Sequence, residues 1–499
     1  MKTNYLQKIL TASVYDVAIE TPLDEATALS KKLGVRFLLK REDLQPVHSY
    51  KIRGAYNKMS TLSRAELEKG VICASAGNHA QGVALSAKRL GAKATIVMPV
   101  TTPEIKTSAV KAYGASIVLH GDSYSDTYEE LHRQIEEHGY TYIAPFDDPD
   151  VIAGQGTVGK EILEQAGRSL DAVYVPIGGG GLASGVAVYL KSVKPSVKVF
   201  GVEPADSDCM DRSIRAGKRV TLDNPGLFAD GVCVKVPGKE TFRLCRQYLD
   251  GIVRVTTAET CAAIKDIFEA TRAICEPAGA LALAAAKKNA KKGETVACVI
   301  SGANMNFDRI RFVSELTEAG EHREALFDCS LPERPGSFLK FVEKIGKRSV
   351  TEFNYRMNDA KTAHVFVGIS VKSADDRMAL KKSFAAAGFA CTDLSDNEIA
   401  REHVRHMVGG ASAVSDEVLH SFAFPERPGA LMKFLSAIAG RWNISLFHYR
   451  NHGSDYGKVL VGFQVPKAER KAFRGVLAEI GYAYDDVTDD PVCRGFLQR

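Results

Sequence analysis

The segment that decides the fold is Val71-Ile-Cys-Ala-Ser-Ala-Gly-Asn-His-Ala-Gln-Gly82, where a short apolar run passes through a polar loop into a helical pattern. Its first residues have the composition of a buried strand, and the apolar spacing from Ala80 to Leu90 predicts a helix. Strands are also predicted at 94–98 and 116–119, with a helix beginning after Pro103 between them. This alternation is typical of an α/β protein with a parallel sheet covered by helices.

The same alternation returns further along the chain. Residues 172–177 and 197–202 are apolar runs with strand character, and a helical pattern covers 182–193 between them. Another buried strand is predicted at 295–300. The α/β pattern therefore continues well beyond the first series.

Three polar or glycine-rich loops directly follow predicted strands. They are Ser75–Gly82, Gly178–Leu182 and Ser301–Asn304. Ligands of open α/β sheets bind beyond the carboxyl ends of the strands, so loops at these ends predict one shared site. Each loop taken alone is equally compatible with an ordinary tight turn between a strand and a helix.

The loop Gly178-Gly-Gly-Gly-Leu182 has the composition of a phosphate-binding turn. Between a strand and a helix, unhindered backbone N–H groups and the positive end of the helix attract an anion. No Gly-Lys-Ser/Thr follows, and the glycines are not spaced as Gly-x-Gly-x-x-Gly, which excludes the common nucleotide-binding loops. The pattern favours a phosphate-bearing cofactor other than a nucleotide, although such a run also suits a flexible connector.

Lys51 lies among short and apolar neighbours in Ser49-Tyr-Lys-Ile-Arg-Gly-Ala55. A lone lysine is usually solvated. The alternative is a desolvated amine with a lowered pKa, which is able to form a Schiff base with an aldehyde cofactor.

An internal repeat occupies the C-terminal part of the chain. Leu331-Pro-Glu-Arg-Pro-Gly-Ser-Phe-Leu-Lys-Phe341 matches Phe424-Pro-Glu-Arg-Pro-Gly-Ala-Leu-Met-Lys-Phe434 at an offset of 93 residues. Each copy is followed by a strand-like segment, Glu352–Arg356 in the first and Leu446–Arg450 in the second. A Pro-Gly turn leading into an amphipathic helix is predicted in each copy. The chain therefore ends in two homologous modules of small-domain size.

Length and composition exclude several classes of protein. A chain of 499 residues predicts about three domains, and 45% hydrophobic with 25% charged residues is a globular composition. The net charge of +5 argues against nucleic acid as a partner. No apolar stretch approaches the roughly 20 residues of a membrane span. Ten cysteines without a Cys-x-x-Cys pair are typical of reduced thiols, and the absence of a signal-peptide pattern favours a cytoplasmic protein.

Together these motifs resemble the fold-type II pyridoxal-phosphate enzymes, and among them the biosynthetic threonine deaminases (threonine ammonia-lyases). The resemblance covers essentially the whole chain and rests on Pro46–Tyr56, Ser75–Gly82, Gly178–Leu182, Glu276–Ala280 and Ser301–Asn306. It implies pyridoxal 5'-phosphate as cofactor and an α/β catalytic domain of the tryptophan synthase β type at residues 1–322. Two α+β ACT-like regulatory domains are implied at 323–410 and 411–499.

The resemblance also implies roles for single residues. Lys51 is implied as the Schiff-base lysine and the catalytic base, Asn78 as the partner of the ring hydroxyl, and Ser301 as the residue facing the pyridine nitrogen. The cofactor phosphate is assigned to Gly178, Gly179, Gly180, Gly181 and Leu182. The substrate carboxylate is assigned to Ser75, Gly77, Asn78 and His79. Tyr355 and Tyr449, in equivalent places of the two modules, are implied in effector pockets, although tyrosines there also suit packing on a sheet face.

The implied reaction is the deamination of L-threonine to 2-oxobutanoate and ammonia, the first step toward isoleucine, with feedback by isoleucine through the C-terminal modules. Valine is a candidate activator, a homotetramer is the expected assembly, and neither nucleic acid nor membrane is expected as a partner. The alternatives are an L-serine dehydratase and a catalytically silent amino-acid sensor. Related serine racemases hold a metal near the segment matching Val202–Asp208, but the acidic spacing differs here and no metal is predicted.

Overall fold

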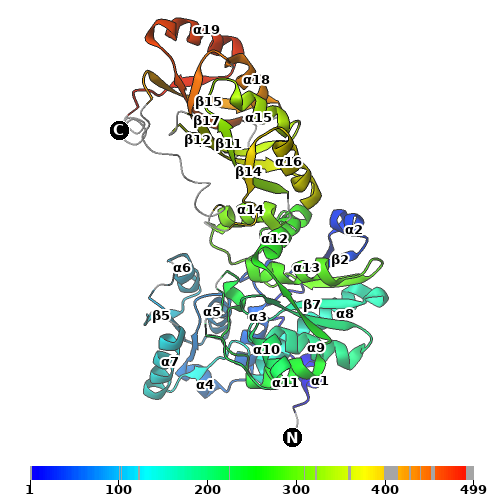
Figure 1. The fold of residues 1–499 in the computed structure, drawn as a ribbon. Helices are drawn as coiled ribbons and strands as arrows, with labels where there is room; N and C mark the ends of the chain where they lie inside the picture. Colours follow the sequence, from blue (N-terminus) through cyan, green and yellow to red (C-terminus); the bar gives the residue numbers. More distant parts are fainter. Residues whose placement is uncertain are drawn as a thin grey trace. The chain divides into compact units, whose positions relative to one another are not determined.

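The chain folds into two compact units, Met1–Thr317 and Glu318–Arg499, which are described separately (Figure 1). The computed structural model describes residues 3–100, 102, 104–121, 124–223, 225–226, 228–307, 309–320, 323–357, 361–397, 400, 414–425, 429–438, 440–450 and 456–490.

The first unit contains a six-stranded sheet in the order β1-β2-β10-β7-β8-β9. Its pairs are parallel except for β1 with β2, which is antiparallel. The strands are β1 (Leu23–Glu25), β2 (Arg36–Lys40), β7 (Ala172–Pro176), β8 (Lys198–Pro204), β9 (Gly251–Val255) and β10 (Thr295–Val299).

A four-stranded parallel sheet in the order β5-β4-β3-β6 belongs to the same unit. Its strands are β3 (Val71–Ala74), β4 (Ala94–Met98), β5 (Ser116–Leu119) and β6 (Thr141–Tyr142). The predicted strands of both series are present, and they lie in two sheets. Alternation of strands with helices shows that the pairs are parallel, but it does not specify which strands pair.

Helices cover both faces of the larger sheet. Along β7, Val173 and Val175 pack with α8 and α9, whereas Ala172 and Tyr174 pack with α12 and α13. This alternation produces two cores, as expected when both faces of a parallel sheet are buried. The helices are α1 (Tyr5–Leu10), α2 (Thr27–Leu33), η1 (Glu42–Leu44), α3 (Lys51–Ser60), α4 (Arg64–Lys69), α5 (Asn78–Leu90), α6 (Glu104–Ala112), α7 (Tyr124–His138), α8 (Pro149–Ala166), η2 (Gly167–Ser169), α9 (Gly181–Val193), α10 (Cys209–Ala216), η3 (Asp230–Val232), α11 (Lys239–Tyr248), α12 (Thr257–Thr271), α13 (Pro277–Asn289) and α14 (Arg309–Gly320).

The second unit is built on one eight-stranded antiparallel sheet in the order β14-β11-β13-β12-β16-β17-β15-β18. The strands are β11 (Glu324–Pro332), β12 (Val350–Arg356), β13 (Thr362–Ser370), β14 (Ala390–Asp393), β15 (Glu417–Pro425), β16 (Asn443–Arg450), β17 (Tyr456–Gln464) and β18 (Tyr484–Asp486). The helices are α15 (Ser337–Ile345), α16 (Ala374–Ala386), α18 (Ala430–Ile438), η5 (Lys467–Glu469) and α19 (Arg470–Ile480).

The sequence repeat appears as two halves of this sheet, joined where β12 pairs with β16. In this register Tyr355 lies opposite Phe447, and Phe353 lies opposite Tyr449. The helices α15, α16, α18 and α19 contribute Phe341, Phe384, Phe434 and Phe473 to one shared core. The predicted helix after each Pro-Gly turn and the predicted strand after each helix are confirmed. The domain boundaries were predicted after residue 322 and after residue 410. Residues 322, 410 and 411 lie outside the described residues, so these boundaries stay predictions.

Cys329 and Cys391 form a disulfide bond in the first half of this sheet. The expectation of reduced thiols is therefore wrong for this pair. The bond forms because the strand register places the two residues opposite each other on β11 and β14, with their Cα atoms 4.1 Å apart. Among the cysteines that the structure describes, the free thiols are those of Cys73, Cys209, Cys233, Cys245, Cys261, Cys275 and Cys298.

Two absences hold for the part of the chain that the structure describes. None of its helices combines the length and the apolarity needed to cross a membrane. It also holds no group of three or more His, Cys, Asp or Glu residues arranged to bind a metal ion.

Candidate active site

Lys51 is the first residue of α3 and follows a tight turn at His48, whose φ is 52°. The Lys51 Nζ donates to the backbone oxygen of Pro145 at 3.1 Å. Burial lowers the pKa of this amine to about 8, while the carboxylate of Glu276 acts in the opposite direction. An amine with such a pKa is partly unprotonated near neutral pH, which suits both a nucleophile and a base.

The four glycines between β7 and α9 form a loop that admits no side chain. An added Cβ would lie 2.9 Å from Val232 Cα at Gly178, 2.3 Å from the Phe146 ring at Gly179 and 2.7 Å from Met210 Cε at Gly180. Gly180 also has a φ of 97°, a conformation that glycine adopts readily. The backbone N–H groups at the start of α9 are thus left unhindered, and this fits the phosphate group of a cofactor.

Lys51 and the glycine loop both contact the segment Pro145–Phe146, which forms a wall common to the two. The carbonyl of Pro145 accepts the Lys51 hydrogen bond, and the next residue, Phe146, packs against Gly179 and Gly181. The loop is held in place by Thr241, whose Oγ1 donates to the backbone oxygen of Gly179 at 2.6 Å. Two segments far apart in the sequence are therefore brought together as the motifs predicted.

The loop between β3 and α5 carries the predicted substrate-binding residues. The Gly77 N–H donates to Ser75 Oγ at 3.3 Å, and a Cβ at Gly77 would project into open space. The His79 side chain is buried, and its Nε2 lies 2.8 Å from the backbone oxygen of Ile143. Burial lowers the pKa of His79 to about 3, so the ring is neutral and Nε2 carries the hydrogen. His79 is therefore not a cation for a carboxylate, and its assignment as a substrate contact stays a prediction that rests on its backbone N–H.

Ser301 follows β10 and lies beside the lysine segment. The Tyr50 N–H donates to the Ser301 backbone oxygen at 3.2 Å, and Ser49 pairs with Gly302 as an isolated β-bridge. The Ser301 side chain is 2% exposed. The third predicted loop therefore flanks Lys51, as expected for a shared site, and the role of its hydroxyl stays a prediction.

Two polar residues of the site were present in the motifs but had no predicted role. Asn78 Nδ2 donates to Glu276 Oε1 at 2.7 Å, and Asn304 Nδ2 donates to Asn78 Oδ1 at 2.7 Å. The signal for Glu276 was an acidic residue directly before the Pro-Ala-Gly start of a helix, and the signal for Asn304 was its place in the Ser301 loop. Their common partner was not evident, because residues 276 and 78 are 198 positions apart.

A buried ionic network anchors α3, the helix that carries Lys51. Arg53 donates through Nε to Glu42 at 2.7 Å and through Nη1 to Glu161 at 2.5 Å, and Lys40 lies 2.6 Å from Glu161. All four side chains are essentially without exposure. Since removing one member leaves an uncompensated buried charge, the network holds the start of α3 in one position.

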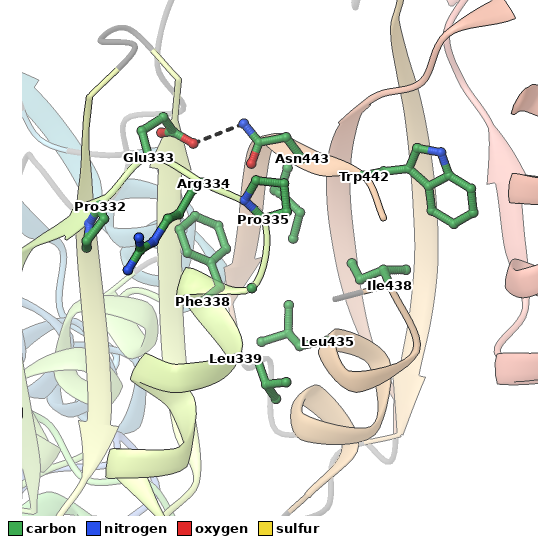
Figure 2. Close-up of a pocket in the computed structure, with 12 residues that line it drawn as sticks. Pro332, Glu333, Arg334, Pro335, Phe338, Leu339, Leu435, Ile438, Trp442 and Asn443 are labelled. Atoms are coloured by element: carbon green, nitrogen blue, oxygen red, sulfur yellow. Dashed lines mark hydrogen bonds between the residues drawn. The ribbon is translucent and has the colours of Figure 1, made fainter. Parts of the chain in front are cut away.

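The second unit has its own cavity, between the Pro-Gly loop of the first repeat and the α18–β16 segment of the second (Figure 2). Within it, Asn443 Nδ2 donates to Glu333 Oε1 at 3.1 Å. The Tyr355 hydroxyl donates to the other oxygen of Glu333 from the buried sheet face. The residues that line the cavity are Pro332, Glu333, Arg334, Pro335, Gly336, Phe338, Leu339, Leu435, Ile438, Trp442, Asn443 and Ile444.

Neither predicted effector tyrosine is among those lining residues. Tyr355 packs against Phe338 with 4.8 Å between ring centroids and reaches the cavity through Glu333. Tyr449 is buried in the core of the same sheet. Their roles in effector binding stay predictions.

Comparison with known proteins follows the same division of the chain. The family described as pyridoxal-phosphate dependent enzyme matches residues 14–302, and the C-terminal regulatory domain of threonine dehydratase matches 315–404 and again 408–497. The biosynthetic L-threonine dehydratase IlvA of Burkholderia multivorans is 54% identical, over 99% of both chains. The chloroplastic biosynthetic threonine dehydratase of Arabidopsis thaliana is 53% identical, over 97% of this chain and 83% of its own length.

A solved structure shows the same likeness over part of the chain. The processed form of threonine deaminase isoform 2 from Solanum lycopersicum superposes with a TM-score of 0.61 at 49% identity, over 62% of this chain and 92% of that one. Identity at these levels, over 97–99% of this chain for the sequence relatives, shows that the chain belongs to the biosynthetic threonine dehydratases, a family of pyridoxal-phosphate-dependent enzymes with a C-terminal regulatory part.

Proposed function

We propose that this chain deaminates L-threonine to 2-oxobutanoate and ammonia by β-elimination of the threonine hydroxyl group, the first step toward isoleucine. The observation that carries the proposal is the wall at Pro145 and Phe146, which brings a buried amine and a glycine cradle for phosphate together. An aldehyde cofactor that also carries a phosphate needs both features in one site.

Bound pyridoxal phosphate supplies an electron sink for the pair released when the Cα–H bond of the substrate breaks. The backbone N–H groups of Gly178–Leu182 would hold its phosphate at the start of α9. Ser301 would present a hydroxyl group to the pyridine nitrogen, and a hydroxyl, unlike a carboxylate, does not hold a proton there. The ring would then withdraw electrons less strongly, which favours rapid elimination.

The Lys51 Nζ accepts the Cα proton of threonine. Its pKa of about 8 leaves part of the amine unprotonated at neutral pH, which a base requires. The N–H groups of the Ser75–His79 loop bind the substrate carboxylate and orient the Cα–H bond. The open space at Gly77 leaves room for the substrate beside this loop.

The test compares Lys51→Ala with Lys58→Ala, which removes a lysine from the same helix. Lys51→Ala is expected to abolish 2-oxobutanoate formation and to prevent borohydride from fixing the cofactor to the protein, because one residue serves both binding and proton transfer. Lys58→Ala is expected to keep both. Turnover of even a few per cent in Lys51→Ala would show that another residue does this work.

For the second unit we propose feedback inhibition by isoleucine bound in the cavity around Glu333. The carboxylate of Glu333 suits an ammonium group, the exposed guanidinium of Arg334 suits a carboxylate, and Leu339, Leu435 and Ile438 provide an aliphatic wall. A branched aliphatic amino acid combines these three features. Valine, as an activator, would compete for the same groups.

The matched pair for this proposal is Glu333→Gln and Glu343→Gln, the latter on the exposed face of α15. Glu333→Gln is expected to raise the isoleucine concentration for half-inhibition about tenfold or more, because a charge-assisted contact is lost. Glu343→Gln is expected to leave it unchanged. Equal sensitivity of both variants to isoleucine would show that the effector binds elsewhere.

The proposal includes a homotetramer in the cytoplasm. Sedimentation tests the assembly, and cell fractionation tests the location.

A further inference from the structure

The side-chain amide of Asn78 is held on both sides by groups that the proposed reaction does not use. Its Nδ2 donates to Glu276 Oε1 and its Oδ1 accepts from Asn304 Nδ2, both at 2.7 Å. An amide NH₂ has two hydrogens. With these bonds made, one N–H of Asn78 remains for a further acceptor.

Asn304 has only one orientation that satisfies its own amide. Its Nδ2 donates both to Asn78 and to the backbone oxygen of Val47, the latter at 2.8 Å. A carbonyl oxygen accepts and never donates, so turning the Asn304 amide over would set oxygen against oxygen. Asn304 is therefore fixed as a donor toward Asn78.

Glu276 is equally fixed on the other side of Asn78. It lies directly before α13, its side chain is buried, and its backbone N–H donates to Gly302 at 3.1 Å. A Cβ at Gly302 would lie 2.7 Å from Oε1, so the glycine leaves the space that the carboxylate fills.

The titratable groups around Glu276 come from three elements. Burial and the charge of Asp230 on η3 raise the pKa of Glu276 to about 7, while Lys106 on α6 lowers it. Lys51 and Tyr50 respond to its charge from the start of α3. In either protonation state one oxygen of Glu276 remains an acceptor for Asn78.

We propose that Asn304 and Glu276 are positioning residues that hold the Asn78 amide as a hydrogen-bond donor toward the cofactor, so that the bound cofactor keeps its ring oxygen deprotonated. The inference rests on the proposed place of Asn78 at that oxygen. A donor stabilises the charged form of an oxygen acid, whereas an acceptor in the same place stabilises the protonated form.

The experiment uses the full-length holoenzyme and its absorption spectrum across neutral pH, together with cofactor affinity from titration of the apoprotein with pyridoxal phosphate. Asn304→Asp sets a carboxylate against Asn78 Oδ1, so the amide is expected to turn over, and Glu276, whose pKa is about 7, then takes up a proton and donates to the turned Oδ1. The spectrum then shifts toward the protonated ring oxygen, and cofactor affinity falls about tenfold. Asn304→Ala is expected to shift the spectrum less, in the same direction. Glu276→Gln keeps an acceptor toward Asn78 and is expected to keep the parent spectrum.

The control is Asn306→Asp, which adds the same charge two residues further along the same loop. A parent-like spectrum in Asn304→Asp, or equal shifts in Asn304→Asp and Asn306→Asp, would overturn the proposal. If circular dichroism shows that Asn304→Asp is unfolded, an unchanged spectrum in Asn304→Ala overturns it instead. The spectrum needs no turnover of threonine, so its outcome is separate from that of the proposed reaction.

Discussion

At the scale of single residues, burial lowers the pKa of two basic side chains of the site, with different consequences for each. The pKa of Lys51 falls to about 8, so its amine exchanges a proton near neutral pH. The pKa of His79 falls to about 3, and its Nε2 hydrogen is committed to the carbonyl of Ile143. In the proposed reaction Lys51 is thus the group that moves protons, whereas the neutral His79 ring holds the loop through its hydrogen bond to Ile143.

His79 predicts a pH dependence of stability. Its pKa is lowered from 6.5 in the unfolded chain to about 3 in the folded one, so below pH 6.5 the unfolded state binds the extra proton. The free energy of unfolding is expected to fall by roughly 1 kcal/mol per pH unit on acidification from this group. His79→Gln keeps an N–H donor and should lack this component in denaturant titrations over the same pH range. Parallel pH curves for both proteins would contradict the prediction.

Serine is expected to be a poorer substrate rather than an excluded one. It lacks one methyl group, and one methyl in a pocket is worth about 1–3 kcal/mol, or roughly 10–200-fold in kcat/KM. The ratio of kcat/KM for threonine and serine measures this directly. Complete exclusion of serine at saturation would require a closure step that depends on the methyl group.

The sequence could predict the residue types of the site but not their mutual bonds. Lys51, the Gly178–Gly181 loop and Ser301 can be named because each lies in a local motif, and the family resemblance of these motifs implies their roles. The acceptor of the Asn78 amide was not visible, because Glu276 reaches it from the start of α13 only after the chain has folded. The neutral state of His79 likewise depends on burial, which no local pattern reveals.

At the scale of elements, the turn from β7 into α9 leads to a test of the glycine cradle. Gly180→Ala would put a methyl group 2.7 Å from Met210 Cε at a φ of 97°. Gly217→Ala has the same kind of backbone, with a φ of 67°, but nothing within 4 Å. Both variants are expected to lose about 1–2 kcal/mol of stability. Only Gly180→Ala should also weaken pyridoxal phosphate binding, by about tenfold or more, and equal binding in both would contradict the cradle.

Element positions were more predictable than element pairing. The predicted strands at 71–74, 94–98 and 116–119 coincide with β3, β4 and β5, because buried strands are short apolar runs. The short strands β1 and β6 carry little apolar periodicity and were not predicted. The division into two sheets depends on contacts between distant segments. The hydrophobic periodicity of a sequence does not indicate such contacts.

At the scale of the whole molecule, the regulatory proposal predicts that the two units are separable in function. Deleting residues from about 325 onward should leave any surviving activity insensitive to isoleucine, because the coupling between the units, on the order of 1–3 kcal/mol, is lost. Activity assays with and without isoleucine measure this. Unchanged inhibition of an active truncated enzyme would place the effector in the first unit.

Tyr355→Phe refines the same prediction in the intact chain. The variant keeps the ring that packs on Phe338 but removes the hydroxyl that holds Glu333. It should therefore need more isoleucine for inhibition while keeping turnover and thermal stability. Tyr449→Ala in the second module is expected to weaken inhibition as well, and unchanged inhibition in both variants would leave the tyrosines a packing role only.

The pairing of β12 with β16 is reciprocal: each repeat offers the other the same segment, with Tyr355 opposite Phe447 and Phe353 opposite Tyr449. Such an exchange is the rule for two subunits related by a two-fold axis. The tandem modules thus resemble a dimer whose two subunits are joined in one chain. Their contact pairs the β12 edge, which a single module would leave exposed. A chain ending after the first module would expose β12 as an open edge and capture a second copy of itself.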